Sequence, residues 1–379
     1  MRAAYVTIFG SSDIHAWSGL GVYILGALRS AGLQTETIGD LRYQCDFVYK
    51  AKEVLYPRVF RKTYRMLWDS LLLKRFAAQV DRALASGDAD VVFSIWTNPI
   101  AYSRTYKPIV FWGDGTLAGL MRLYPDHCNL CAETIRDGHR AERLALGKCH
   151  LAIYSSDWAA RSAIEDYGAD PAKVKVVPFG ANIDCSRTVQ DIRANLGNKG
   201  YDTCRLLFVG VDWYRKGGDI ALQVVTLLNR RGLPAELHVV GCHPPGELPE
   251  FVKVHGFVSK ATGEGQRLLD DVFSQAHFFI LPTRADCTPV VFPESCSFGL
   301  PILTTNVGGI PTIIRDGRNG FAYPPDADPE QYCDTIERLW SSRQEYERLA
   351  LSAFQEYSER LNWGVAGRRV AELLQEFCG

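Results

Sequence analysis

The segment "HFFILPTRADCTPVVFPESCSFGLPILTTN" (277–306) predicts a strand, a loop, a short helix and a second strand. Its ends, "HFFILPT" (277–283) and "PILTTN" (301–306), are short apolar runs without polar alternation, as is typical of strands that are covered on both faces. Between them, "VVFPESCSF" (290–298) favours a short helix. Two strands joined through a helix form a parallel unit, because a parallel connection needs a crossover. We therefore expect an α/β protein with parallel sheets.

Similar apolar runs occur throughout most of the chain and fall into two series. A polar, turn-rich stretch at 180–203 separates the series and marks a domain boundary. We predict a first domain over 1–185, a second over 186–358 and a C-terminal helix over 359–379, with two doubly wound sheets forming a cleft. The expected strands lie in the runs 3–10, 90–96, 108–113, 150–156 and 174–180, and then 205–210, 235–241, 252–258, 277–283 and 301–306.

The composition is that of an ordinary globular protein. The chain has 379 residues, of which 47% are hydrophobic and 22% charged, and its net charge of −1 argues against nucleic acid as a main partner. The start, "MRAAYVTIFG" (1–10), reads as a strand and lacks the features of a secretory signal. No apolar run approaches the ~20 residues of a membrane-spanning helix. We expect a soluble cytoplasmic protein whose 11 cysteines are reduced.

A basic loop follows the first strand of the second series. In "FVGVDWYRKGGDIAL" (208–222), Arg215 and Lys216 lead through a glycine pair at 217–218 into a helix. Two cations at the positive end of a helix dipole suit a diphosphate, and the glycines would let an anion approach the backbone. A basic turn with solvated side chains is an equally weighted alternative.

Two carboxylates stand eight residues apart in the segment that opened this description. Asp286 follows a strand, and Glu294 lies on the expected short helix, so both can be directed at one pocket. Carboxylates accept hydrogen bonds from hydroxyl groups, which suits a sugar and a ribose. The alternative is that Asp286 caps the helix and Glu294 is a solvated helix residue.

The pattern around these acids resembles that of the retaining glycosyltransferases of the GT-B fold, in the large family 4 type (glycosyl transferases group 1). The hallmark there is E-x7-E, then "FGLP", a glycine pair and a turn. In this chain the two acids are Asp286 and Glu294, with seven residues between them in the pattern D-x7-E. "FGLP" follows at 298–301, the glycine pair at 308–309 and the turn, "DGRNGF", at 316–321. The first acid departs from the pattern, because Asp is one methylene shorter than Glu and has a different reach.

The resemblance extends over nearly the whole chain. The "RKGG" loop (215–218) sits where the family binds diphosphate, 155–184 is similar to the end of its first domain, and 360–373 to its closing helix. The implied fold is GT-B, with two Rossmann-like doubly wound parallel-sheet domains that face each other across a cleft. The second domain would bind the donor and the first the acceptor.

The resemblance also implies roles for single residues. Glu294 would hold the donor ribose, Asp286 the hydroxyls of the transferred sugar, and Arg215 and Lys216 the leaving diphosphate, together with the main chain of 295–299. Phe257 and Val258, in "HGFV" (255–258), would lie beside the nucleotide base.

Two loops of the first domain carry further candidates. "SGLGVYILGAL" (18–28) precedes a helix, and in the resembled family this loop closes over donor phosphate and acceptor, which makes Gly19 and Gly21 candidates. It fails the dinucleotide pattern G-x-G-x-x-G. Asp114, in "VFWGDGT" (110–116), would orient the acceptor or face the donor sugar; a turn-forming Asp between glycines is an equally weighted alternative.

The function implied by the resemblance is a retaining, metal-independent transfer of a sugar. The donor would be a UDP- or GDP-sugar, the acceptor a glycan, a lipid or a small molecule, and no further cofactor is expected. Asp286, Asp114 and Lys216 would be the catalytic residues. The alternative is a non-catalytic nucleotide-sugar or glycan-binding protein on the same scaffold.

Other polar features receive simpler interpretations. Residues 50–82 hold nine Lys or Arg against three Asp or Glu, so they suit an anionic membrane or an acidic acceptor, although a helix lining the cleft is favoured two to one. His139 and Glu142 are interpreted as the solvated face of a helix. Cys128-x-x-Cys131 lacks the second ligand pair of a zinc site.

Overall fold

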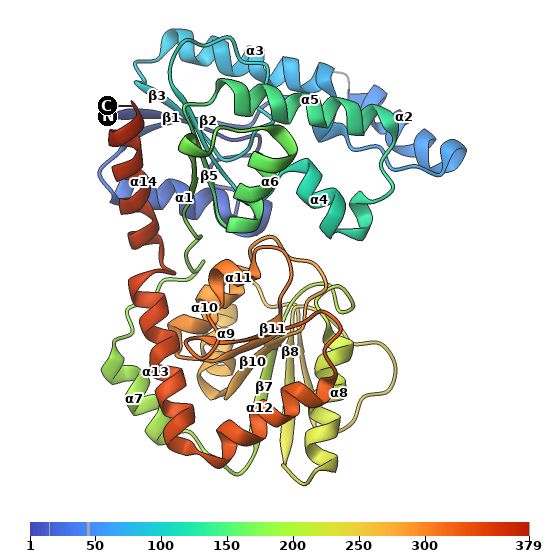
Figure 1. Ribbon diagram of the computed structural model, residues 1–379, viewed down its shortest axis with the longest axis vertical. Coiled ribbons are helices and arrows are strands. Elements are labelled where there is room, and N and C mark those ends of the chain that lie inside the picture. The colour runs from blue at the N-terminus through green and yellow to red at the C-terminus, as the bar shows by residue number, and fades with distance from the viewer. Residues whose placement is uncertain (15, 44–45, 379) are drawn as a thin grey trace. The chain divides into compact units, whose positions relative to one another are not determined.

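The computed structural model describes residues 1–14, 16–43 and 46–378. Its contacts divide the chain into two compact units, as Figure 1 shows. Unit 1 comprises Met1–Pro178 and Trp363–Gly379, and unit 2 comprises Phe179–Asn362. No helix of the described ranges is long and apolar enough to cross a membrane.

Unit 1 is built on a six-stranded parallel sheet in the order β2-β1-β3-β4-β5-β6. The strands are β1 (Arg2–Val6), β2 (Gln34–Ile38), β3 (Val91–Ser94), β4 (Ile109–Gly113), β5 (Leu151–Tyr154) and β6 (Val174–Val176). The helices are α1 (Leu20–Ser30), α2 (Asp46–Leu55), α3 (Ser70–Ser86), α4 (Leu117–Leu123), α5 (Ala132–Lys148), α6 (Asp157–Tyr167) and α14 (Trp363–Cys378).

Unit 2 repeats this plan with a second parallel sheet, in the order β12-β11-β10-β7-β8-β9. The strands are β7 (Cys204–Val209), β8 (Ala235–Val240), β9 (Val252–Gly256), β10 (Phe278–Leu281), β11 (Ile302–Thr305) and β12 (Gly320–Tyr323). The helices are α7 (Val189–Asn198), α8 (Gly218–Arg230), α9 (Gly263–Gln275), α10 (Val291–Ser297), α11 (Ile310–Ile313), α12 (Pro329–Ser341) and α13 (Arg343–Glu359).

The predicted parallel α/β architecture is confirmed, and each of the ten apolar runs contains a strand. The central strands are buried along their whole length, because helices cover both faces of each sheet. Two strands, β2 and β12, were not predicted. Both lie at the edge of their sheet; β2 is largely exposed and polar, and β12 is short and begins within the segment 316–321 interpreted as a turn.

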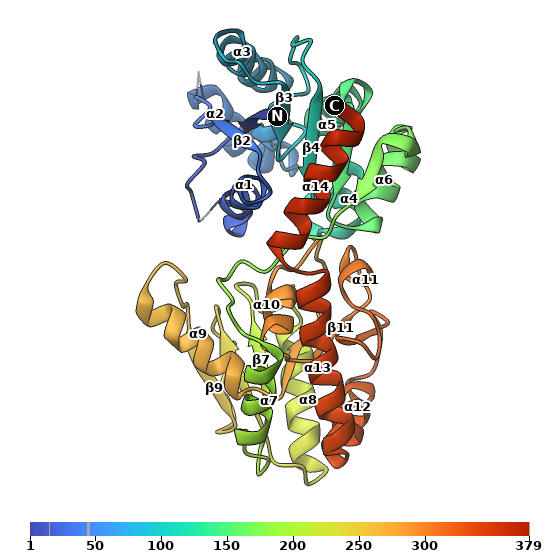
Figure 2. The ribbon, with the colours of Figure 1, turned by 90° about the vertical axis from the view of Figure 1, so that its left-hand side faces the viewer.

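Helix α14 packs against α1 within unit 1, and Figures 1 and 2 show it in red at the end of the chain. The two backbones come close at Gly367, where an added Cβ would lie 2.5 Å from the carbonyl oxygen of Ala27. Tyr23 of α1 also stacks on Trp363, with ring centroids 6.2 Å apart. The contact therefore depends on the absence of a side chain at one position of α14.

A pair of Gly→Ala substitutions tests this contact. Gly367→Ala should lower the free energy of unfolding by about 1–3 kcal/mol, because the new methyl group overpacks the helix interface. Gly26→Ala, on the exposed side of α1 with open space around it, should instead raise it by about 0.5–1 kcal/mol through helix propensity. Denaturant unfolding of both variants measures the difference. Equal effects would show that α14 is not closely packed on α1.

Candidate functional site

The predicted donor residues of unit 2 all lie in loops or helices that follow the carboxyl ends of strands. Arg215 and Lys216 come after β7, Phe257 comes after β9, and Asp286 and Glu294 come after β10. Because all strands of the sheet are parallel, these ends share one edge. The sheet thus gathers the candidates on the same side of unit 2.

The loops after β7 and β10 are joined by their backbones. The carbonyl oxygen of Arg215 accepts hydrogen bonds from the N–H of Arg284, at 2.8 Å, and from the hydroxyl of Thr283, at 3.1 Å. The Arg215 guanidinium in turn donates to the carbonyl oxygen of Ala285, at 2.9 Å, and lies near Asp212. Arg215 therefore fixes the loop that carries Asp286.

Lys216 and Asp286 form an ion pair at this junction. Their side chains are 13% and 9% exposed, so each charge depends on the other for compensation. The N–H of Gly309, in the predicted glycine pair, donates to the backbone carbonyl of Asp286 at 3.3 Å. Asp286 is thus held by its side chain and its main chain, and the alternative that it simply caps the following helix is not supported, because α10 shows no side-chain cap.

The glycine pair after Lys216 has a packing role. Gly217 is in the left-handed region at φ 77°, and a Cβ there would lie 1.9 Å from the carbonyl oxygen of Pro282. A Cβ on Gly218 would lie 2.2 Å from the ring of Trp213. The structure thus gives these glycines a different reason from the anion approach that the sequence suggested: Gly217 lets the loop after β7 close against that after β10, and Gly218 leaves room for a ring of its own loop.

Glu294 is buried on the short helix α10, so its interpretation as a solvated residue is wrong. Its carboxylate forms an ion pair with Lys260 and also accepts a hydrogen bond from the backbone N–H of Asn182. Burial raises the pKa of Glu294, and the Lys260 ammonium and the Asn182 N–H act in the opposite direction. The lysine therefore favours the ionised form of a carboxyl group that burial alone would neutralise.

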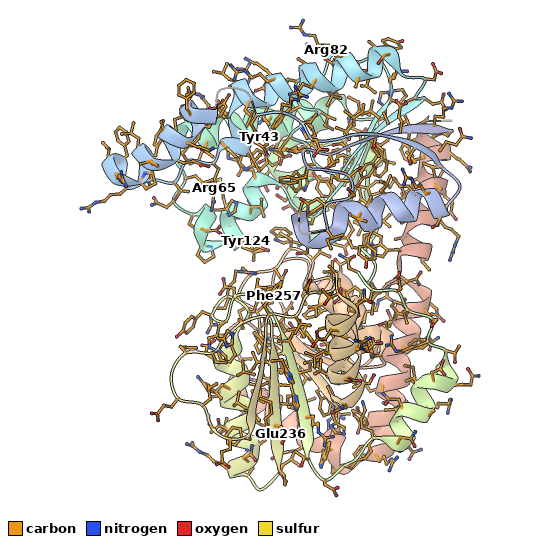
Figure 3. The ribbon with its side chains drawn as sticks, turned by 180° about the vertical axis from the view of Figure 1, so that it is seen from behind. Tyr43, Arg65, Arg82, Tyr124, Glu236 and Phe257 are labelled. Atoms are coloured by element: carbon orange, nitrogen blue, oxygen red, sulfur yellow. The ribbon has the colours of Figure 1, made fainter. Side chains whose placement is uncertain are left out.

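Lys260 was not identified from the sequence. It lies 34 residues before Glu294, in the loop after β9, and no local spacing relates the two. Asn182 lies in the stretch that resembles the end of the family's first domain, so there a sequence signal existed. The loop after β9 also carries Phe257, which is 72% exposed and is labelled in Figure 3, and Val258, which is half-buried. Phe257 is thus available for stacking.

The N–H groups that the sequence assigned to phosphate binding are partly in use. Phe298 donates to the carbonyl oxygen of Ser295 at 3.0 Å, and Gly299 to that of Cys296 at 2.9 Å. These bonds close the last turn of α10. The main chain at 298–299 is therefore committed to the helix rather than to a ligand.

In unit 1, the glycine loop and the loop after β4 meet. The indole N–H of Trp17 donates to the carboxylate of Asp114 at 3.1 Å. Trp17, Ser18 and Gly19 all have positive φ, at 50°, 57° and 79°, which is a strained conformation for the first two. Gly21, in the first turn of α1, packs near Ile95 and Tyr5. The loop thus brings Gly19 and Asp114 to the same edge of the unit 1 sheet.

Glu142 is fully buried in unit 1, so the interpretation of the α5 residues as a solvated face is wrong. One carboxyl oxygen accepts hydrogen bonds from the N–H of Leu117, at 3.2 Å, and from the hydroxyl of Thr97; the other, Oε2, has no partner among the described residues. Burial raises the pKa of Glu142 to about 8, so it is protonated at neutral pH. His139 is half-buried, and its ring lies 2.8 Å from the Tyr167 hydroxyl.

No cluster of three or more His, Cys, Asp or Glu that could hold a metal occurs within the described ranges. Of the Cys-x-x-Cys pair, Cys128 is exposed and Cys131 is buried, and both are free thiols.

Comparisons with known proteins define the class of fold first. Sucrose-phosphate synthase from Thermosynechococcus elongatus aligns with a TM-score of 0.71 at 15% identity, over 99% of this chain and 98% of that one. Anabaena HepE, solved with UDP and glucose, aligns with a TM-score of 0.63 at 16% identity, over 99% of both. The fold is that of the GT-B glycosyltransferases.

A sequence-family model matches part of the chain. Residues 203–342, which include Lys216, Lys260, Asp286 and Glu294, match the family model "Glycosyl transferases group 1". This segment, which lies within unit 2, thus carries the sequence features of group 1 glycosyl transferases, in agreement with the resemblance seen in the sequence.

Two relatives are named D-inositol 3-phosphate glycosyltransferase. That of Thermomonospora curvata is 28% identical over 256 residues, 61% of this chain and 58% of its own. That of Acidothermus cellulolyticus is 30% identical over 204 residues, 49% of this chain and 45% of its own. The chain thus spans about half the length of these relatives.

A double-mutant cycle tests the compensation between Lys216 and Asp286. Lys216→Met should lower the free energy of unfolding by about 3 kcal/mol, because it leaves a nearly buried carboxylate without its cation. Adding Asp286→Asn should recover most of that loss, because the remaining amide is neutral. Urea unfolding of the single and double variants measures the coupling. Additive losses would contradict the pair.

The pH dependence of unit 1 tests Glu142. The folded pKa of about 8 lies above the ordinary value of 4.5, so the folded state keeps a proton that the unfolded state loses. The free energy of unfolding should therefore fall as the pH rises from 4.5 to 8. Above pH 8 Glu142 should cause no further loss. Glu142→Gln, which keeps the acceptor oxygen, should be more stable than the wild type by an amount that grows over this window. Urea unfolding of both proteins at pH 5, 7 and 8.5 measures this difference in the free energy of unfolding. The same difference at all three pH values would contradict the prediction.

Proposed function

We propose that the chain is a retaining glycosyltransferase that moves a sugar from a nucleotide-sugar donor to a glycan, lipid or small-molecule acceptor. The observation that carries the proposal is the pairing of two lysines with two nearly buried carboxylates, Lys216 with Asp286 and Lys260 with Glu294, at the carboxyl edge of the unit 2 sheet. All four lie in the segment that matches the glycosyl transferases group 1 model. Buried charges kept at a loop-rich edge suit a charged, hydroxyl-rich ligand.

The donor diphosphate would be bound by Lys216, with Arg215 beside it. An ammonium group has three donors, so Lys216 can keep its contact with Asp286 and still donate to a phosphate oxygen. The N-terminus of α8, which begins at Gly218, adds a partial positive charge nearby.

The two acids would take the hydroxyl groups of the donor. Asp286 would accept from the transferred sugar, and its shorter reach would require the sugar to approach its loop more closely than a Glu would. Glu294 would accept from the ribose diol. Lys260 and the Asn182 N–H occupy only part of the acceptor capacity of this carboxylate, so acceptor positions remain for the two hydroxyls of the ribose.

The nucleotide base would stack on Phe257, with Val258 beside it, and a uridine or guanosine donor is proposed. The solved structures of HepE with UDP, with UDP and glucose, and with UDP-glucose support the nucleotide-sugar class of donor on this fold. No further cofactor and no metal ion enter the proposal.

In the reaction, the bond between the anomeric carbon and the diphosphate breaks while the acceptor oxygen attacks from the same face. Positive charge develops on the sugar and negative charge on the leaving phosphate, where Lys216 stabilises it. The leaving phosphate oxygen takes the acceptor proton, so no protein base is required. In unit 1, Asp114 would orient the acceptor or face the donor sugar, and Gly19 and Gly21 would belong to a loop that closes over donor phosphate and acceptor.

Nucleotide affinity tests the role of Glu294. The wild type should bind UDP or GDP at least about tenfold more tightly than the 2′-deoxy analogue, because the analogue lacks a hydroxyl that donates to the charged carboxylate. Glu294→Gln should reduce this preference, and the exposed Glu264→Gln is the matched control. Calorimetry on the nucleotide selected from a thermal-shift panel of UDP-, GDP- and ADP-sugars measures both. Equal discrimination in all three proteins would contradict the assignment.

Turnover separates the enzyme from a binding protein. The wild type should release nucleoside diphosphate from the selected donor, and proton NMR should show the freed sugar first in the donor's own anomeric configuration. Binding without release would support the non-catalytic alternative, and the opposite anomer would contradict retention.

A further inference from the structure

An exposed apolar ridge runs along one segment of unit 1, far along the chain from the candidate donor site. It is formed by α2 and the single π-helical turn that follows at Tyr56–Phe60. Figures 1 and 3 show this segment at the outer end of unit 1. Six large apolar side chains are exposed here within fourteen residues: Phe47, Val48, Val54, Leu55, Val59 and Phe60. Clusters of this kind are rare on soluble proteins unless they bind something.

The opposite side of the same segment is firmly attached to unit 1. Tyr49 is buried, and the Lys52 ammonium lies 3.0 Å from Asp69 and 2.7 Å from Glu133. The Tyr56 hydroxyl also donates to Glu133, at 2.8 Å. The segment is thus held in place by its polar and aromatic side, while its apolar side faces outward.

The end of the ridge is anchored as well. The N–H of Thr63 donates to the carbonyl oxygen of Asn129 at 2.8 Å, and the amide of Asn129 donates to the carbonyl oxygen of Arg61 at 2.7 Å. The exposure of Val59 and Phe60, at 60% and 59%, is therefore a property of the packed segment and not of a detached one.

The charges that flank the ridge are mostly positive. Exposed cations lie on both sides of the exposed Glu53, and they are Lys50, Arg58, Arg61 and Lys62. Apolar side chains interleaved with Lys and Arg are the pattern of segments that lie in a membrane interface and contact anionic headgroups. A symmetric contact between two copies of the chain would instead bring these cations against one another.

We propose that residues 47–62 dock unit 1 on an anionic lipid surface, with Phe47, Val54 and Phe60 entering the interface and the flanking cations contacting lipid phosphates. The proposal is narrower than the basic stretch 50–82 that the sequence indicated. From Ser70 onward, α3 buries most of its apolar side chains in the core, among them Leu72, Leu73 and Phe76. The membrane-docking proposal is independent of the proposed sugar transfer, because none of the candidate donor residues lies in residues 47–62.

Vesicle co-sedimentation tests the proposal. The full chain should sediment with vesicles of phosphatidylcholine that contain about 30% phosphatidylglycerol, and it should stay in solution with phosphatidylcholine alone or in high salt. The variant Phe47→Ser/Phe60→Ser should lose most of the binding, because apolar insertion is removed. The variant Arg58→Glu/Arg61→Glu/Lys62→Glu should bind the anionic vesicles at least about tenfold more weakly, because the attraction to the headgroups is replaced by repulsion.

Matched controls lie elsewhere on unit 1. Tyr106→Ser removes an exposed aromatic residue outside the ridge, and Arg82→Glu reverses an exposed cation on α3, labelled in Figure 3. Both should bind vesicles as the wild type does. Thermal unfolding of every variant checks that it is folded.

Three outcomes would overturn the proposal. The first is wild-type protein that stays in solution with anionic vesicles, and the second is control variants that lose binding as strongly as ridge variants. The third is a concentration-dependent dimer, seen by sedimentation velocity, that the Phe47→Ser/Phe60→Ser variant abolishes, which would assign the ridge to a second copy of the chain.

Discussion

A charge removed from water must be compensated, and this constraint shapes the end of the unit 2 sheet. Asp286 and Glu294 follow the same strand, and both are nearly inaccessible to solvent. Each meets a lysine from a different loop, Lys216 after β7 and Lys260 after β9. Three loops from separate parts of the chain are therefore tied together by two ion pairs. A ligand that binds here meets charges that are already held in position, which is the arrangement that favours recognition of an anion with hydroxyl groups.

Unit 1 meets the same constraint in a different way. Glu142 has no cation beside it, and its buried carboxyl group keeps its proton instead, with a pKa of about 8. Its contacts with Leu117 and Thr97 join the segments after β4 and β3. A neutral buried acid thus supports the backbone near Asp114, whereas in unit 2 the buried acids stand in the candidate site itself and are each paired with a lysine. The two units share a fold and differ in how they treat buried carboxylates.

Close backbone contacts complete the arrangement of unit 2. Gly217 allows the loop after β7 to lie against Pro282, Gly218 leaves room for Trp213 of that same loop, and the Arg215 carbonyl receives two donors from the loop after β10. The loop that carries Asp286 is therefore fixed by main-chain geometry as much as by charge. The glycines of this stretch therefore meet a packing requirement of the loops.

The sequence by itself determined the parallel α/β class, ten of the strands and the local placement of Asp286 and Glu294, because these depend on apolar runs and short-range spacing. It missed β2, an edge strand that is polar and largely exposed, and β12, a short edge strand that begins within the segment 316–321 interpreted as a turn. The tertiary structure alone decided that Glu142 is buried, because its helix reads as polar and only packing shows which side faces the core. It alone paired Lys260 with Glu294, since β9 and β10, which precede them, are separated in the sheet by β7 and β8, and no spacing along the chain indicates that the segments after them meet.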